Sequence, residues 1–248
     1  MPDIKESNNC GKNLEQLLRL DNSPIAVKML RDESEIPAGA LRPRKDKGYH
    51  LAQCQAFAMS RRENTTVAML KEDNWCPGPV IAYGLVPRPN NPEARKSNTG
   101  DVFPYGKYIG ILTAPLITAG FEPDVVIIYS NTNQLRTILL AMKQDERPLV
   151  QGFFFPFSCA HSVVTPILTG KYAVVLPDPG EYARALTQAG EMMFAVPAEK
   201  IIGLVNDLIN YKSSGPGYVH ETSMIMRPDF PQPELYRKVF AAWGMDHE

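Results

Sequence analysis

Four cysteines are the residues of this sequence best suited to bind a metal or to act as nucleophiles: Cys10, Cys54, Cys76 and Cys159. In a reducing compartment, cysteines that do not simply fill the core are typically metal ligands or nucleophiles. Cys10 lies in a polar N-terminal stretch that we expect to be frayed, so we assign it no role. The other three lie in or beside predicted helices or a Gly/Pro turn, where backbone N–H groups can stabilise thiolates.

The spacing of these three cysteines is long. Twenty-one residues lie between Cys54 and Cys76, and 82 lie between Cys76 and Cys159, which is no compact Cys-x-x-Cys signature. Spacing alone favours Cys54 and Cys159 as small buried hydrophobic residues. The Cys76-Pro77-Gly78 turn favours Cys76 as a metal ligand, because its thiol could project from the turn. A proline also follows a ligating cysteine in ferredoxin sequences.

Cys159 follows a run of aromatic residues at 153–157. Clustered phenylalanines most commonly form plain core, although the same residues could wall a dry pocket around a redox centre. The run is compatible with both interpretations.

Composition and charge limit the classes of function. The 248 residues are 44% hydrophobic and carry 26 Lys and Arg against 27 Asp and Glu, a formal net charge of −1. This composition predicts a folded core and disfavours a nucleic-acid partner. The apolar stretches are too short or too interrupted to predict a membrane span. The first nine residues lack the pattern of an export signal, which predicts a cytoplasmic location.

Hydrophobic periodicity predicts strands interleaved with helices. Predicted helices cover 13–20, 50–62, 80–85, 131–143, 160–168, 197–211 and 233–243, and predicted strands cover 25–30, 65–70, 124–129, 151–155, 171–176 and 191–196. Residues 177–180 predict a turn. We expect an α/β or mixed α+β fold of unknown sheet order, in one domain over residues 1–248 with an optional surface excursion at 86–100.

Several segments together resemble the ArCR family of uncharacterised prokaryotic proteins. They are Cys76-Pro77-Gly78 with Ala82 and Gly84-Leu85, the strand at 123–129 leading to Gln134, Phe157-Ser158-Cys159, Pro179-Gly180, Glu191-Met192 and Val196-Pro197. The resemblance covers most of the chain and brings no known reaction. It implies a three-cysteine pattern, which supports an iron–sulfur cluster held by Cys54, Cys76 and Cys159.

Three thiolates on a [4Fe-4S] cluster leave one iron without a cysteine, and that iron could take a small-molecule ligand, a substrate or a fourth protein ligand. His50 and His161 are the histidines nearest in sequence to the cysteines. His50 is expected to share a helix face with Cys54 and is the better placed, although an exposed surface histidine is the simpler interpretation.

Three alternatives remain open at this point. The same cysteines with His50 could form a tetrahedral zinc site. Cys54 or Cys159 could instead be the nucleophile of an enzyme. All the cysteines could also be core residues of a non-catalytic module that binds a small ligand. The sequence predicts neither a reaction nor an oligomeric state.

Overall fold

The computed structural model describes residues 2–87, 100–142, 150–154, 156–213 and 234–245. The chain divides into two compact units, Met1–Ser213 and Ser214–Glu248. The first contains the sheet, and the second contributes one amphipathic helix, α10 (Glu234–Ala242). The expectation of a single domain over 1–248 stays a prediction. Most of the expected excursion at 86–100 lies outside the described residues.

A seven-stranded mixed sheet forms the centre of the first unit. Its strands are β1 (Ile25–Leu30), β2 (Val67–Leu70), β3 (Gly110–Pro115), β4 (Val125–Ser130), β5 (Gln151–Phe154), β6 (Ala173–Leu176) and β7 (Met192–Pro197). Their spatial order is β2-β3-β1-β4-β7-β6-β5. Only β5 and β6 pair in parallel, and every other neighbouring pair of this sheet is antiparallel.

Helices and short 3₁₀ turns connect the strands. The helices of this unit are α1 (Ile4–Leu18), α2 (Pro43–Lys47), α3 (Gln53–Glu63), α4 (Pro77–Ala82), α6 (Thr132–Met142), α7 (Ser158–Thr169), α8 (Pro179–Arg184) and α9 (Ile201–Ser213). The 3₁₀ turns are Glu33–Glu35, Lys71–Asp73, Leu116–Thr118 and Ala198–Lys200. Together with the sheet they confirm a mixed α+β fold.

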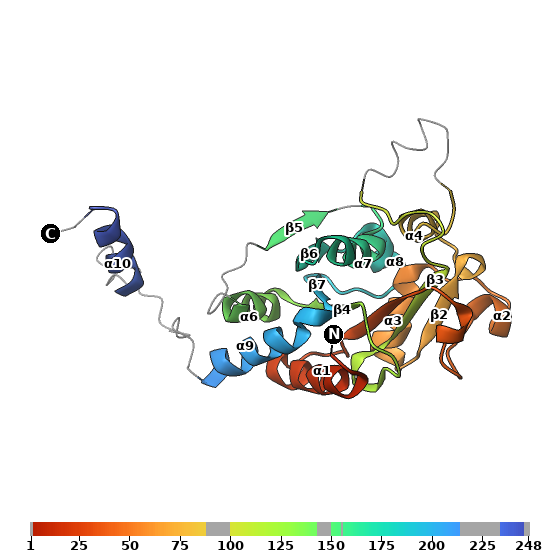
Figure 1. Cartoon of the computed structure of the whole chain (residues 1–248), viewed down its shortest axis with the longest axis horizontal. Coiled ribbons are helices and arrows are strands. Elements are labelled where there is room, and N and C mark those ends of the chain that lie inside the picture. The colour runs from red at the N-terminus through yellow and green to blue at the C-terminus, as the bar shows by residue number, and fades with distance from the viewer. Residues whose placement is uncertain (1, 88–99, 143–149, 155, 214–233, 246–248) are drawn as a thin grey trace. The chain divides into compact units, whose positions relative to one another are not determined.

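The two faces of the sheet bury separate cores, because alternate residues of each strand point to opposite sides. On one face, which we call the apolar face, α1, α6 and α9 cover residues such as Val126 and Phe194. On the other, which we call the cysteine face, α3, α4 and α7 cover residues such as Ile127 and Met193, with α8 beside α3. Figure 1 shows the two sets of helices on the two sides of the sheet. Cys54, Cys76 and Cys159 belong to the cysteine face, and Cys10 belongs to the apolar face.

The expectation that Cys10 lies in a frayed segment is wrong. Asp3 accepts a hydrogen bond from the backbone N–H of Glu6, and the Glu6 side chain accepts one from the N–H of Asp3, so a capping box begins α1 well before residue 13. Cys10 is consequently helical and buried. Its environment is apolar, and burial raises the pKa of its thiol to about 11.

Three helices or strands of the structure, α2, β3 and α8, were not included in the sequence interpretation. Residues 110–115 form β3, which is paired on both sides, and residues 177–180 lead into α8 instead of forming only a turn. The predicted strand, helix and strand at 124–155 all form, but β4 and β5 are not neighbours, because β7 and β6 lie between them. The parallel crossover is instead β5-α7-β6.

The described residues include no helix with the length and apolar character needed to cross a bilayer.

Candidate functional site

The three cysteines of the cysteine face lie at the starts of three helices. Cys54 is the second residue of α3, Cys159 is the second residue of α7, and Cys76 immediately precedes α4. Each is less than 9% exposed. The N-terminal turn of a helix has unpaired N–H groups and a partial positive charge, which favour a nearby anion. Three separate chain segments must meet for these thiols to form one site.

Backbone hydrogen bonds join the segments of Cys54 and Cys76. The N–H of Leu51 donates to the carbonyl of Asp73 at 2.9 Å, and the N–H of Trp75 donates to the carbonyl of Leu51 at 2.8 Å. This short parallel bridge lies just before α3 and just before α4. The first residues of α3 and α4 are therefore held close to each other.

Close packing joins the segments of Cys76 and Cys159. A Cβ atom added to Gly78 would lie only 2.1 Å from the ring of Phe157. Phe157 itself has φ of 66°, the left-handed conformation, directly before α7. A non-glycine residue adopts this conformation only at some cost, which the surrounding structure must offset. Glycine at 78 thus lets the Cys76 turn approach the start of the helix that carries Cys159.

A reciprocal pair of hydrogen bonds joins α7 to α8. The N–H of Ser158 donates to the Asp178 carboxylate at 2.9 Å, and the N–H of Asp178 donates to the Ser158 hydroxyl at 3.1 Å. Asp178 also caps α8 by accepting from the N–H of Gly180 at 2.7 Å. The carbonyl of Gly180 in turn accepts from the Cys54 thiol at 3.7 Å. These contacts complete a ring of four segments.

The surroundings of Cys54 and Cys159 disfavour the ionised form of both thiols. Burial raises the pKa of Cys159, and the charges of Cys54, Glu181, Asp178 and Cys76 raise it further. Burial and the charge of Glu181 raise the pKa of Cys54 to about 12, against the opposing effect of Arg184. Both thiols are therefore protonated at neutral pH in this environment. A nucleophilic cysteine needs the opposite shift.

Glu181 is a fully buried carboxyl group beside the thiols. Its Oε2 accepts hydrogen bonds from the Tyr129 hydroxyl at 2.9 Å and from the Thr187 hydroxyl at 3.0 Å. Its Oε1 has no hydrogen-bond partner. Burial raises the pKa of Glu181 to about 7. Arg61 lies 3.8 Å above the ring of Tyr129 but forms its ion pair with Glu191, at 2.8 Å.

Tyr83 is another buried residue whose polar side-chain atom has no hydrogen-bond partner. The residue is 0% exposed, and its hydroxyl accepts and donates no hydrogen bond within the described part of the chain. Burial raises its pKa, and the charges of Cys159 and Cys76 raise it further, which places the phenol near both thiols. A buried polar atom left unpaired costs about 1–3 kcal/mol. The Tyr83 hydroxyl and Glu181 Oε1 are therefore suited to contact a further group at this position.

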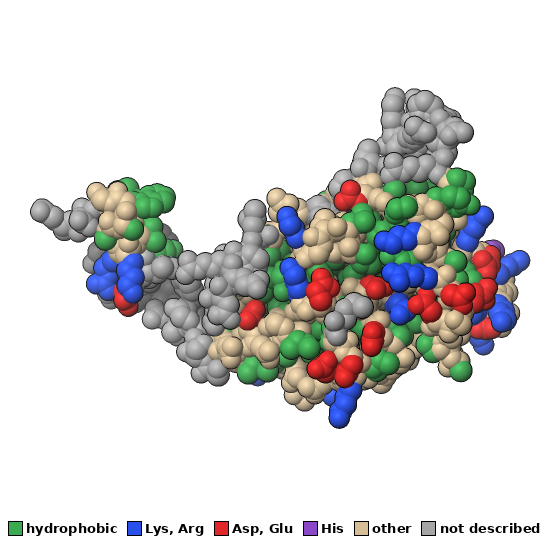
Figure 2. Space-filling view, in the orientation of Figure 1, with side chains coloured by type: hydrophobic (Ala, Val, Ile, Leu, Met, Phe, Trp, Pro, Cys, Tyr) green, Lys and Arg blue, Asp and Glu red, His purple; other side chains and the backbone are tan. Residues whose placement is uncertain are grey.

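The three cysteines with Tyr83, Glu181 and Arg184 are called the cysteine site below. Arg184 lies at its solvent side, where the guanidinium is 5.3 Å from the ring centre of Trp75 and packs against Gly180. Trp75 is 62% exposed. Figure 2 shows basic and hydrophobic side chains together on the surface where α4 and α8 lie in Figure 1. This is the solvent-facing boundary of the site.

In the described residues, the donor set does not form a site for a single metal ion, because no three His, Cys, Asp or Glu side chains there form a group that could hold one. All ligands of a tetrahedral zinc must reach the same ion within about 2.0–2.3 Å. Cysteines of a cubane cluster bind different irons, so their sulfurs are farther apart. Helix N-termini and the unpaired Tyr83 hydroxyl also suit a negatively charged cluster, whose sulfurs accept hydrogen bonds.

The histidines do not take the expected positions. His50 precedes α3, which begins at Gln53, and its side chain is exposed. The expected helix face shared with Cys54 is therefore wrong. His161 is buried in α7 and packs against Gly100, where a Cβ atom would lie 1.9 Å from its ring. Burial lowers the pKa of His161.

The aromatic run at 153–157 is not uniformly core. Phe157 packs against the core of the cysteine face and against Gly78, whereas Phe154, on the outermost strand β5, is 59% exposed. Phe155 lies outside the described residues. Of the side chains of this run that the structure describes, Phe157 is the one that helps to shape the cysteine site.

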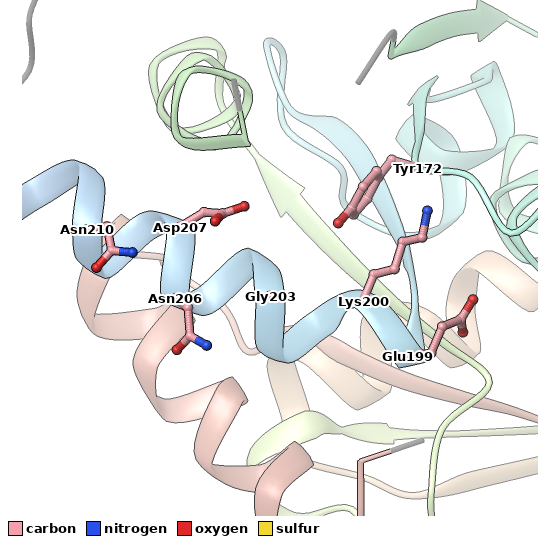
Figure 3. A pocket seen from close by; sticks show the side chains of 7 residues that line it. All are labelled: Tyr172, Glu199, Lys200, Gly203, Asn206, Asp207 and Asn210. Carbon is pink, nitrogen blue, oxygen red and sulfur yellow. The ribbon is translucent and has the colours of Figure 1, made fainter. Parts of the chain in front are cut away.

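A polar groove of about 390 Å³ lies apart from the cysteine site, along α9 (Figure 3). Its lining residues are Tyr172, Glu199, Lys200, Gly203, Asn206, Asp207 and Asn210. Lys200 lies 5.1 Å from the ring centre of Tyr172. The groove contains no cysteine and no buried carboxyl group, so it offers none of the chemistry of the cysteine face.

Sequence reasoning missed Glu181, Tyr83 and Arg184. Charged side chains, and the hydroxyl group of tyrosine, normally lie at the protein surface. The residue types therefore give no indication that these side chains belong to a buried site. A usable indication did exist for Glu181. The spacing Asp178-x-x-Glu181, with Pro179 as the first helical residue, is typical of a helix start. The pattern does not indicate that this helix lies beside the Cys159 segment, because that depends on the contact of Asp178 with Ser158.

Comparison with known proteins identifies relatives without a described activity. A family described as Uncharacterised ArCR matches residues 13–207. An uncharacterised protein of Methanocaldococcus jannaschii is 22% identical over 229 residues, which are 85% of this chain and 97% of that protein. No solved structure matches the chain. The family match includes every residue of the cysteine site and leaves out Cys10.

Proposed function

The chain belongs to the uncharacterised ArCR family, and from that premise we propose that it is an iron–sulfur protein in which Cys54, Cys76 and Cys159 bind a [4Fe-4S] cluster. The observation that carries the proposal is the ring of contacts that joins the three cysteine segments beside two buried polar atoms without partners. When bound, such a cluster supplies electron transfer or a Lewis-acidic iron.

Each protein group has a defined task in this proposal. The three cysteines supply one thiolate each, and the starts of α3 and α7 direct N–H groups toward the negative charge. Tyr83 donates a hydrogen bond to a sulfur atom of the site. Arg184 balances negative charge at the solvent side, where Cys54 and Cys76 both raise its pKa against the opposing effect of partial burial.

The iron that has no cysteine is the proposed binding position for a small-molecule ligand or substrate. Solvent-side residues Arg184 and Trp75 flank the approach to the site. We also propose a reducing, cytoplasmic location, where all four free cysteines stay available as thiols. The proposal includes no particular reaction.

The raised pKa values of Cys54 and Cys159 argue against an activated nucleophile at either position. The exposed position of His50 argues against its use as the fourth ligand of a zinc ion. A ligand-binding module in which the cysteines are only core residues would leave the Tyr83 hydroxyl and Glu181 Oε1 unexplained.

Iron, acid-labile sulfide and zinc should be measured in protein prepared without oxygen. We expect about four irons and about four sulfides per chain, with broad thiolate-to-iron absorption. The variants Cys54→Ala, Cys76→Ala and Cys159→Ala should each lose most of both, whereas Cys10→Ala, a matched buried cysteine on the apolar face, should retain them. Folded wild-type protein that contains no iron and sulfide, or that contains stoichiometric zinc instead, would overturn the proposal.

A further inference from the structure

Glu181 is the only residue of the cysteine site that combines a carboxyl group with complete burial. Three cysteines leave the fourth iron of a [4Fe-4S] cluster without a protein thiolate. The two histidines nearest to the cysteines in sequence are poorly placed, because His50 is exposed and outside α3, while His161 packs against Gly100. Within the cysteine site, the remaining type of protein ligand is a carboxylate.

The two oxygens of Glu181 have different environments. Oε2 accepts from the hydroxyls of Tyr129 and Thr187, at 2.9 and 3.0 Å. Oε1 is buried and has no partner. Metal-binding carboxylates are commonly oriented in this manner, with hydrogen bonds to one part of the group and the metal at the other. An unpaired buried carboxyl oxygen is otherwise unfavourable by about 1–3 kcal/mol.

Glu181 also lies beside the segments that carry the thiols. The carbonyl of the preceding residue, Gly180, is 3.7 Å from the Cys54 sulfur. The start of α8 is tied to the start of α7 through Asp178 and Ser158, one residue before Cys159.

No positively charged side chain pairs with Glu181 within the described part of the chain. Arg61 forms its salt bridge with Glu191 and contacts the ring of Tyr129. Arg184 faces Cys54 and Trp75. A buried carboxylate without a cationic partner is a group whose charge a bound iron would stabilise.

We propose that Glu181 is the protein ligand of the fourth iron, which it binds through Oε1, so that the complete ligand set is Cys54, Cys76, Cys159 and Glu181. This inference rests on the proposed function. A carboxylate is a harder ligand than a thiolate and is less suited to iron in a sulfur cluster. The fourth iron is thus held by an exchangeable oxygen ligand that a small molecule entering beside Arg184 can replace.

Mössbauer spectroscopy of protein loaded with ⁵⁷Fe tests this assignment. Wild type should show one iron of the four with parameters of oxygen coordination, and Glu181→Gln should change that iron alone while the other three keep their thiolate parameters. Glu199→Gln is the matched control, because Glu199 is an exposed carboxylate of the polar groove (Figure 3) and should leave all four irons unchanged.

A second measurement needs no variant and so does not depend on the folding of Glu181→Gln. The wild-type chain labelled with ¹³C at glutamate carboxyl carbons should show ¹³C hyperfine coupling to the reduced cluster in electron–nuclear double resonance spectra. Absence of this coupling, or an unchanged fourth iron in Glu181→Gln, would overturn the Glu181 assignment and leave the three-cysteine cluster intact. A folded wild type without iron and sulfide would overturn the proposed function, and this inference with it.

Discussion

Helices cover both the apolar face and the cysteine face of the sheet, but the two faces bury different types of residue. Within the described residues, α1, α6 and α9 contribute no buried Asp, Glu, Lys, Arg or His side chain. The cysteine face buries Arg61, His161, Asp178 and Glu181. Buried charges are unfavourable unless they are paired, and they are rarely present without a reason. The contrast indicates that the apolar face is packed with hydrophobic side chains, whereas the cysteine face includes charged groups whose burial is unfavourable.

Cys10 makes the contrast specific. It is a buried free cysteine like the other three, and its pKa is raised mainly by burial. No other cysteine contributes to that shift, whereas Cys54 and Cys76 both contribute to the shift of Cys159. A buried cysteine is therefore not by itself an indication of a site. The meeting of several buried cysteines with unpaired polar atoms is the informative feature.

The largest expected effect comes from the apolar face. Leu204→Ala removes a fully buried side chain of α9 and should lower the free energy of unfolding by about 2–5 kcal/mol, through lost burial and the cavity that remains. Denaturant titration measures this change. Iron and sulfide per folded molecule should stay at the wild-type value, and their loss from folded Leu204→Ala would contradict the separation of the two faces.

The pH dependence of stability should reveal Glu181 in protein without iron. Because its folded pKa is raised from 4.5 to about 7, its contribution to stability is fully present below pH 4.5 and is lost as pH rises through 7. The loss corresponds to about 3 kcal/mol. We expect Glu181→Gln to lack this component when free energies of unfolding are measured between pH 4.5 and 8. Identical pH profiles for both proteins would refute the expectation.

Gly78→Ala should separate Cys76 from Cys159. The new methyl group would meet the Phe157 ring at 2.1 Å, so the turn or the ring must move, at a cost of about 1–3 kcal/mol. Iron content should fall along with stability, and the additional change Phe157→Ala should restore part of the iron. Gly203→Ala is the matched control in α9, because nothing lies within 4 Å of its added Cβ. It should raise stability by about 0.5–1 kcal/mol.

The smallest expected effect has the opposite sign. Tyr83→Phe removes a buried hydroxyl that has no partner, so the variant without iron should be more stable by about 1 kcal/mol. The reduction potential of iron-loaded Tyr83→Phe should fall, because a hydrogen bond to a cluster sulfur is lost. Thermal unfolding and potentiometry measure the two changes. A destabilised iron-free variant would show that the hydroxyl has a structural partner.

Much of the fold follows from local sequence patterns. The strand predicted at 25–30 coincides with β1, and Cys76 precedes a helix as expected, because Pro77 suits the first helical position. β3 was missed although it is buried, since Gly110 and Pro115 at its ends resemble breaks. The sheet order could not be predicted, because the pairing of β7 with β4 and β6 depends on contacts far apart in sequence.

The sequence predicts that Cys54, Cys76 and Cys159 meet at one site, but it does not predict the contacts that join their segments. The contacts that join them are a backbone bridge at Leu51, a glycine against Phe157 and a capping carboxylate at Asp178. No sequence pattern around these residues indicates which residue each of them contacts. The family resemblance is confirmed by the match over 13–207, but it carries no description of Glu181 or Tyr83.

The central place of β7 sets an order of events during synthesis. Residues 192–197 leave the ribosome after all three cysteines of the site, yet β7 supplies the hydrogen bonds between β4 on one side and β6 on the other. A nascent chain that ends before Met192 therefore lacks the strand that joins β4 to β6 in the finished sheet. We expect the proposed metal loading to follow the pairing of this late strand.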